Sequence, residues 1–198
     1  YIVGGYFSSS NIDLGNGVSL TNKGSKDGMI IKYNVSGEVE WAQGIGGPAN
    51  DQIKSIVSTR DGGYIVGGYF YSDSIDLGNG IILSNNTNGT RYADGMVIKY
   101  SSSGEAEWAQ GIGGPATDQI KSIVSTRDGG YIVGGYFYSS SLDLENGVSL
   151  TNKGSADGMI IKYSSNGKVE WAQGIGGTNE EYIKSVAETS NGGYIVGG

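Results

Sequence analysis

The chain contains no cysteine and no histidine, and only two of its 198 residues are proline. Without cysteine there is no disulfide framework, no thiol nucleophile and no thiolate metal site. Without histidine the chain lacks the side chain that most often acts as an acid or base near neutral pH, and it cannot form a catalytic triad that depends on imidazole. These two absences exclude much of the known chemistry of enzymes.

Long apolar runs and an excess of positive charge are also absent. No apolar run approaches the ~20 residues that cross a bilayer as a helix, so we expect no membrane insertion. The 13 lysines and arginines against 20 aspartates and glutamates give a formal net charge of -7. Because that charge repels phosphate backbones and anionic lipid, we expect no nucleic-acid partner. The chain opens on Tyr1 without a charged leader, and we expect it to be part of something longer.

Glycine and tyrosine are abundant, with 37 and 14 residues. Glycine does not recur at every third position, so a collagen triple helix is excluded. A hydrophobic content of 37% is too high for a disordered tail. The composition therefore predicts a folded, turn-dense, all-β protein.

The sequence repeats itself. The string YIVGG begins at residues 1, 64, 131 and 194, which divides one repeat array into units 1–63, 64–130 and 131–193 and a stub, 194–198. Units 1–63 and 131–193 are identical at 44 of 63 positions without gaps, so the copies must share one backbone. The four extra residues of the middle unit fall in Asn85 to Ala93, which we expect to be a surface loop.

Each unit contains four short runs with strand composition, bounded by glycine-containing turns. In the first copy they are Tyr1 to Phe7, Gly28 to Tyr33, Val39 to Ile45 and Ile53 to Thr59. Four antiparallel strands every ~65 residues are typical of β-propeller blades. A threefold β-prism or β-trefoil is the alternative, since three units would close such a fold. Three blades alone would leave two faces uncovered, so a propeller would need further repeats or another copy of the chain.

The order of motifs within a unit carries a family resemblance. The first copy reads Asp27-Gly28-Met29-Ile30-Ile31-Lys32-Tyr33, Gly37, Trp41-Ala42, Gly46-Gly47, Asp51 and Gly63-Tyr64-Ile65-Val66-Gly67-Gly68. Over essentially the whole chain this order resembles the bacterial seven-bladed β-propeller repeat, the SBBP repeat. The chain departs from it by having methionine or valine where the family has an aromatic residue after Asp-Gly. The resemblance implies a propeller in a bacterial protein that is secreted or on the cell surface, without assigned catalytic residues.

Likeness to other propellers further implies an order of strands. Ile53 to Thr59 would lie nearest the axis, followed outward by Tyr64 to Phe70, Asp94 to Tyr100 and a strand of the Val39 type. Residues 1–45 would then lack an inner strand, which a segment such as Ile183 to Thr189 of a partner chain could supply.

Asp-Leu-Gly-Asn-Gly and its variants recur once per unit, beginning at Asp13, Asp76 and Asp143. Oxygen ligands beside glycines are suited to Ca²⁺, although the spacing does not match an EF-hand loop. Aspartate and asparagine also cap turns with their own side chains. We expect turn capping, and name these three aspartates as the metal ligands if calcium binds; no other cofactor is expected.

Aromatic side chains are the best candidates for ligand contact. Trp41, Trp108 and Trp171 are suited to stacking on sugar rings, and Tyr71 and Tyr138 lie beyond a strand end, where we expect exposure. The alternative is that each tryptophan packs between blades. The recurring lysines, namely Lys32, Lys99 and Lys162 together with Lys54, Lys121 and Lys184, are expected to extend buried stems to solvated ammonium groups.

Carboxylates also recur, at Asp27, Asp94 and Asp157 and at Asp51, Asp118 and Glu181. Paired carboxylates hydrolyse glycosidic bonds in many enzymes. An active site usually breaks symmetry, and the marked divergence at Thr178 to Ala187 adds only Glu180 beside Glu181. We therefore expect these carboxylates to cap turns and to form hydrogen bonds between blades.

Three functions are compatible with the sequence. The first is a non-enzymatic scaffold or adhesive module outside the cell that binds a glycan or protein. The second is a structural protein that assembles through blade edges into a ring or fibre. The third, an enzyme acting on polysaccharide, is the weakest.

Overall fold

The computed structural model of the chain describes residues 1–86 and 92–198. Residues 87–91, in the expected loop from Asn85 to Ala93, lie outside this described part. The expectation of an all-β protein is confirmed, because every regular element in the described ranges is a strand and every strand pair within a sheet is antiparallel. In this part of the chain, no helix has the length and apolarity needed to cross a membrane.

The long strands form three sheets and a terminal hairpin. Sheet I is ordered β1 (Ile2–Phe7), β4 (Asp27–Tyr33) and β5 (Val39–Ile45). Sheet II is ordered β6 (Asp51–Ser58), β7 (Tyr64–Phe70), β10 (Asp94–Tyr100) and β11 (Ala106–Ile112). Sheet III is ordered β12 (Asp118–Ser125), β13 (Tyr131–Phe137), β16 (Asp157–Tyr163) and β17 (Val169–Ile175). The terminal hairpin pairs β18 (Ser185–Glu188) with β19 (Tyr194–Gly197).

The four runs expected in the first copy are confirmed, with bounds that differ by at most two residues. The expected order within a sheet is also confirmed, since β6, β7, β10 and β11 follow one another both along the chain and across sheet II. Sheet I contains the second, third and fourth strands of this order and no counterpart of β6 among the described residues. Each complete sheet therefore takes its first strand from the end of the preceding sequence unit.

Short hairpins between the second and third strands were not expected. They pair β2 (Asn11–Asp13) with β3 (Ser19–Thr21), β8 (Ser74–Asp76) with β9 (Ile82–Ser84), and β14 (Ser141–Asp143) with β15 (Ser149–Thr151). Every one of these strands has three residues. Leu20, Leu83 and Leu150 are buried where β3, β9 and β15 contact the outermost strand of a sheet. One buried or half-buried residue per strand is too short a pattern to be detected as a periodicity in the sequence.

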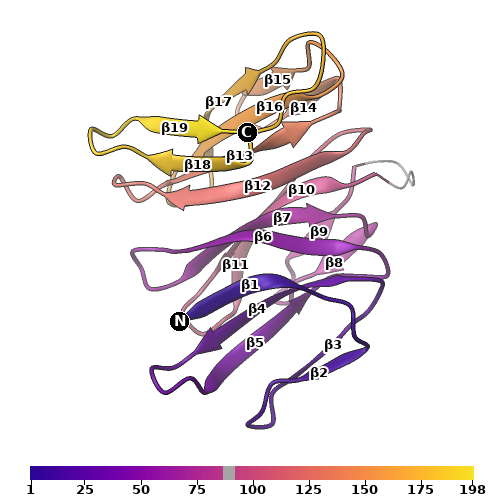
Figure 1. The fold of residues 1–198 in the computed structure, drawn as a ribbon, viewed down its shortest axis with the longest axis vertical. Helices are drawn as coiled ribbons and strands as arrows, with labels where there is room; N and C mark the ends of the chain where they lie inside the picture. The colour runs from indigo at the N-terminus through magenta and orange to yellow at the C-terminus, as the bar shows by residue number, and fades with distance from the viewer. Residues whose placement is uncertain (87–91) are drawn as a thin grey trace.

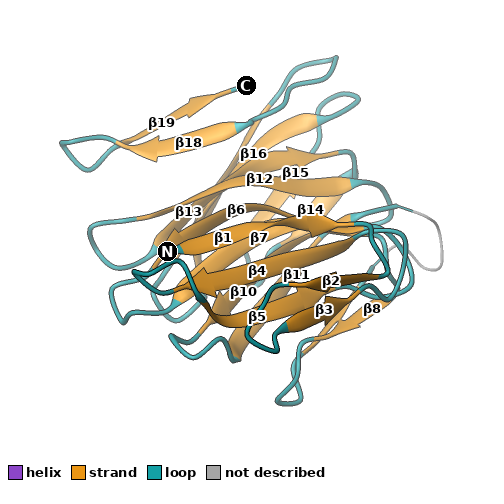
Figure 2. Cartoon of the chain, turned by 60° about the horizontal axis from the view of Figure 1, so that its bottom comes forward, coloured by secondary structure: helices purple, strands orange, loops and turns teal. Residues whose placement is uncertain are grey.

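The sheets stack face to face in chain order, from sheet I at the bottom of Figure 1 to the terminal hairpin at the top. Figure 2 shows the same stack from a second direction. The first strands of successive sheets contact each other, β6 against β12 and β12 against β18. Apolar side chains fill the interfaces: Ile45 of sheet I lies in one core cluster with Val66 of sheet II, and Ile112 of sheet II in another with Val133 of sheet III.

The two glycines of the Gly-Gly pair in each second strand are required for different reasons. A Cβ on Gly67 would lie 2.5 Å from Cδ1 of Ile123 in the next sheet, so this glycine lets two sheets approach closely. A Cβ on Gly68 would lie 1.9 Å from the carbonyl oxygen of Gln52 in the same sheet. The register of β6 against β7 shifts at this point, between Ile53 and Ser55, which indicates a β-bulge.

Candidate functional site

Tyr71 and Tyr138, expected from the sequence to contact ligand, line one groove. Each directly follows the second strand of a sheet, β7 in sheet II and β13 in sheet III. Both side chains are half-buried, so they are less exposed than expected. The groove has a volume of about 540 Å³, and its lining is completed by Tyr92, Ala116, Thr117, Gln119 and Tyr136. A concave surface with several phenol rings and few charges is suited to binding a sugar or a peptide.

Ring contacts hold the tyrosines of the groove in place. Tyr136 and Tyr138 meet edge to face, with centroids 6.0 Å apart, and Tyr69 and Tyr71 repeat this contact at 5.9 Å. The hydroxyl of Tyr136 donates to Oε1 of Gln119 at 2.9 Å. Burial raises the pKa of Tyr136 to about 12. The rings therefore form a pre-organised surface, which lowers the entropy cost of binding.

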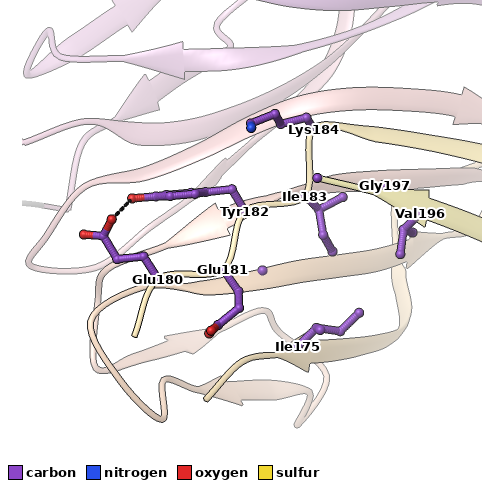
Figure 3. Close-up of a pocket in the computed structure, with 10 residues that line it drawn as sticks. Ile175, Glu180, Glu181, Tyr182, Ile183, Lys184, Val196 and Gly197 are labelled. Atoms are coloured by element: carbon purple, nitrogen blue, oxygen red, sulfur yellow. Dashed lines mark hydrogen bonds between the residues drawn. The ribbon is translucent and has the colours of Figure 1, made fainter. Parts of the chain in front are cut away.

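The divergent segment Thr178 to Ala187 extends this aromatic surface. Tyr182 packs edge to face on Tyr136, with centroids 4.6 Å apart, and its hydroxyl donates to Oε2 of Glu180 at 2.6 Å (Figure 3). The hydroxyl of Tyr138 donates to Oε1 of the same carboxylate at 3.2 Å. The hydrogen bond to Glu180 raises the pKa of Tyr182, and the same bond lowers the pKa of Glu180.

Glu180 and Glu181, the residues behind the enzyme hypothesis, face different partners. The carboxylate of Glu181 accepts the backbone N–H of Gly177 at 2.8 Å and points away from Glu180 in Figure 3. The cavity beside them, of about 380 Å³, lies between Ile175 of sheet III and Val196 of the terminal hairpin. The two carboxylates do not face one another across it.

Lysine ammonium groups alternate with tyrosine rings next to the groove. In this lysine–tyrosine row, each lysine lies over one or two rings that come from successive sheets. The distances from ammonium nitrogen to ring centroid are 5.0 Å for Lys26 over Tyr6, 5.5 and 5.4 Å for Lys54 over Tyr6 and Tyr69, and 5.1 and 5.2 Å for Lys121 over Tyr69 and Tyr136. Each is within the range of a cation–π contact. Tyr136 belongs to both the row and the groove.

The three tryptophans lie away from the groove, on the outermost strands. Trp41 packs on Tyr64 of the next sheet, with ring centroids 5.9 Å apart, and its indole N–H donates to the carbonyl of Ser102 at 3.2 Å. Trp108 makes the corresponding ring contact with Tyr131. Trp171 packs on Tyr194 of the terminal hairpin and is the most exposed of the three. The contacts of Trp41 and Trp108 are thus contacts between sheets.

Asp13, Asp76 and Asp143 are exposed and lie in separate turns. Each accepts, through Oδ1, the backbone N–H two residues ahead, at 2.9, 2.9 and 3.2 Å. This is the turn capping expected of them. Across the described ranges, no group of three or more aspartate or glutamate side chains is close enough to hold a metal ion. Calcium binding stays a prediction.

The carboxylates of Asp51 and Asp118 cap turns from buried positions. Asp118 accepts the backbone N–H groups of Gly114, Tyr138 and Ser139 and the hydroxyl of Ser139, at 2.6 to 3.1 Å, and Asp51 is bound in the same way. Burial raises the pKa of Asp118, and these hydrogen bonds partly offset the rise. The carboxylates of Asp51 and Asp118 thus satisfy backbone N–H groups of the turns around them.

Asp94 is buried with fewer partners. Its Oδ2 accepts the backbone N–H of Asn86 at 2.7 Å, but its buried Oδ1 has no hydrogen-bond partner among the described residues. Burial, with a smaller contribution from repulsion by Asp118, raises the pKa of Asp94 to about 7. Asp27 and Asp157 have the same unpartnered buried oxygen. Because these oxygens are closed off from solvent, they are not placed to meet a substrate.

The expectation of solvated ammonium groups is wrong for Lys99 and Lys162, which are 2% and 3% exposed. Lys99 lies 3.0 Å from Oδ2 of Asp61 and 2.9 Å from Oε2 of Glu107, and it donates to a backbone carbonyl. Burial by itself lowers the pKa of Lys99, but the hydrogen bonds to Glu107 and Asp61 outweigh it and the net shift is upward. Lys162 has the equivalent partners in sheet III. Each ammonium group is thus held within its own sheet, between a carboxylate of the outermost strand and a carboxylate of the turn that joins the first two strands.

Two parts of the site were not predicted from the sequence. Tyr92 was missed because it adjoins the insertion of the middle unit and has no tyrosine counterpart in the other copies. The lysine–tyrosine row was missed because its members are far apart in sequence. A signal was present in the fixed spacing of Lys54 and Tyr69, repeated as Lys121 and Tyr136.

Comparisons with known proteins give two distant similarities. The chain is 24% identical over 180 residues to the regulatory protein FlaEY of Caulobacter vibrioides, an alignment that covers 89% of this chain and 18% of that protein. It is 28% identical over 163 residues to the uncharacterized WD repeat-containing protein L264 of Acanthamoeba polyphaga mimivirus, covering 74% of this chain and 11% of that protein. The chain thus spans less than a fifth of either relative. No family model matches it.

Proposed function

We propose that the chain is a segment of a β-propeller that acts as a non-enzymatic binding scaffold outside the cell, with the groove of Tyr71 and Tyr138 as its ligand site. The propeller is supported by the four-stranded sheets, whose strands are ordered as in a blade and which stack face to face. Similarity to a WD repeat-containing protein agrees with it. The SBBP-type resemblance supports a secreted or cell-surface location in a bacterium.

The groove is the observation that carries the binding function. It gathers four phenol rings from different positions of the sequence on one concave surface, of about 540 Å³. Tyrosine offers a large apolar face and a hydroxyl at low entropy cost, which suits the alternating C–H and O–H surfaces of sugars. Repetition of similar surfaces along a longer array would add avidity. A glycan is therefore the preferred ligand.

Affinity gel electrophoresis of the full chain against neutral and acidic polysaccharides tests this proposal. We expect retardation by at least one polysaccharide, and about tenfold weaker binding after Tyr71→Ala and Tyr138→Ala together, the usual scale for the loss of central aromatic contacts. Tyr1→Ala, which removes a ring that is 82% exposed, serves as the control and should bind like the wild type. The proposal fails if no polysaccharide retards the chain or if all variants bind equally.

Self-assembly is a second candidate function, favoured by the two ends of the stack. Val3 of sheet I is 44% exposed, whereas its counterparts Val66 and Val133 are fully buried against the preceding sheet. Ile175 of sheet III is 39% exposed, whereas Ile112 is 2% exposed against the following sheet. The two ends therefore present complementary faces, as head-to-tail association of copies requires.

Light scattering over a range of concentrations tests assembly. We expect a native mass that rises in steps of 20.6 kDa, and a lower mass after Val3→Asp, which charges one end. Val35→Asp, at a position that is 95% exposed in a turn, controls for the added charge. A monomeric mass at every concentration contradicts this second function.

A further inference from the structure

The lysine–tyrosine row depends on a backbone irregularity that is repeated in sheets II and III. Lys54 is the extra residue at the register shift between Ile53 and Ser55, and Lys121 is the extra residue between Ile120 and Ser122. A β-bulge of this kind re-aims one side chain and is common beside binding sites.

Their ammonium groups lack the partners that other lysines of the chain have. Lys99 and Lys162 are each held by two carboxylates, whereas within the described ranges no carboxylate lies at ion-pair distance from Lys54 or Lys121. Lys54 donates to Oε1 of Gln52 at 2.7 Å, and Lys121 donates to Oε1 of Gln119 at 2.6 Å. Each ammonium has three N–H groups, so donors are left for a ligand.

Charge in the row is uncompensated although the chain as a whole is acidic. Burial, together with repulsion from Lys54, lowers the pKa of Lys121 to about 8. Burial, together with repulsion from Lys26, lowers the pKa of Lys54. A bound anion would relieve this repulsion and strengthen the positive charge on both side chains.

The row is continuous with the groove. Gln119 and Tyr136 line the groove, and the same two residues contact Lys121. A chain molecule in the groove would therefore reach the ammonium groups. Phenol rings between the cations favour a ligand with apolar C–H faces between its anionic groups, and the net charge of -7 disfavours a densely charged phosphate polymer.

We propose that the lysine–tyrosine row binds the carboxylate groups of an acidic polysaccharide, a chain of uronic acid units whose sugar rings lie along the tyrosines. Lys54 and Lys121 then form charge-assisted hydrogen bonds with carboxylates of successive parts of one chain. The inference rests on the proposed function, because it names the ligand class of the same groove. Ligand binding by these two lysines also explains why a bulge is present at each of them, which packing alone does not explain.

Polygalacturonate and its methyl-esterified form test the proposal, because esterification removes the charge and keeps the sugar backbone. Affinity electrophoresis of the full chain should show at least tenfold tighter binding to the acid. Lys54→Met with Lys121→Met should weaken binding to the acid at least tenfold, whereas Lys54→Arg with Lys121→Arg should restore it. The control pair Lys153→Met with Lys168→Met removes the same charge from exposed turns and should change binding less than twofold.

The possible outcomes distinguish failure of this inference from failure of the proposed glycan-binding function. Equal binding of acid and ester, with loss of both after Tyr71→Ala and Tyr138→Ala, overturns the inference and leaves the glycan site standing. Absence of binding to every polysaccharide overturns both. Equal or tighter binding of single-stranded oligothymidylate than of polygalacturonate also overturns the inference, because the row would then select charge and not sugar. Circular dichroism of each variant establishes that it is folded.

Discussion

Replacing Asp94 with asparagine should stabilise the protein at neutral pH and leave it nearly unchanged at acidic pH. Asp94 is fully buried, and its Oδ1 has no partner among the described residues, so burial raises its pKa from 3.8 to about 7. Below pH 7 the folded protein therefore holds a proton on this carboxyl. Asparagine is an uncharged mimic of that protonated form.

The sign and size of the effect follow from proton linkage. Between pH 3.8 and pH 7 the folded state keeps the proton of Asp94 and the unfolded state has lost it, so the free energy of unfolding falls as pH rises. Each pH unit in this window costs about 1.4 kcal/mol, which amounts to roughly 4 kcal/mol by pH 7. The contribution is fully present below pH 3.8 and gone above pH 7. Asp94→Asn should recover it above pH 7.

Urea unfolding at pH 4, 5, 6, 7 and 8, followed by tryptophan fluorescence, measures this difference. Asp51→Asn is the matched control, because Asp51 is equally buried but accepts four hydrogen bonds. An asparagine amide there would face N–H groups, so we expect a loss of about 1–3 kcal/mol. The two variants should thus change stability in opposite directions at pH 8.

A carboxyl titration by carbon-13 NMR gives an independent measurement of the pKa of Asp94. The reasoning is refuted if the stability difference between Asp94→Asn and the wild type is constant from pH 4 to pH 8. It is refuted equally if the carboxyl titrates near its ordinary pKa of 3.8.

Two further predictions compare positions across copies of the repeat. Glu145 has a φ of 73°, where the equivalent residue of the middle unit, Gly78, has 82°. Glu145→Gly should therefore raise the free energy of unfolding by about 1 kcal/mol, and Gly78→Glu should lower it by a similar amount. Urea unfolding measures both changes, and the opposite signs would contradict a backbone cause. Gly104 and Gly37 share a positive φ, but only at Gly104 would a Cβ meet Trp41, 2.8 Å from its Cδ2. Gly104→Ala should therefore lower the free energy of unfolding by at least about 1 kcal/mol more than Gly37→Ala. Equal losses in urea unfolding would mean that Trp41 moves aside without cost.

Local chemistry made the long strands predictable. Apolar alternation and the turns at Gly37 and Gly62 place the strand ends, because both glycines adopt a positive φ that other residues avoid. The order of strands within a sheet was also accessible, since it follows from the resemblance of the repeat to a blade. The three-residue hairpin strands were not, because each holds a single buried or half-buried residue between two exposed ones.

The candidate site was only partly predictable. Tyr71 and Tyr138 were identified from their place beyond a strand end, but nothing in the sequence shows that they share one groove. Asp13 could be assigned to a turn because its partner is two residues away. Trp41 could not be assigned, because its partners, Tyr64 and Ser102, belong to another sheet.

The sequence by itself determined the repeat, the strands and the glycine turns, since these depend on neighbours along the chain. Only the tertiary structure decided which lysines are buried in ion pairs and which lie over tyrosine rings. Lys99 and Lys121 look alike in sequence, each on a strand and each repeated in other copies. One is buried between two carboxylates, and the other, displaced by a bulge, lies between tyrosine rings of two sheets. The pairing of strands within sheet II brings Asp61 and Glu107 to Lys99, whereas the stacking of sheet III on sheet II brings Tyr69 to Lys121. Neither arrangement follows from the local pattern.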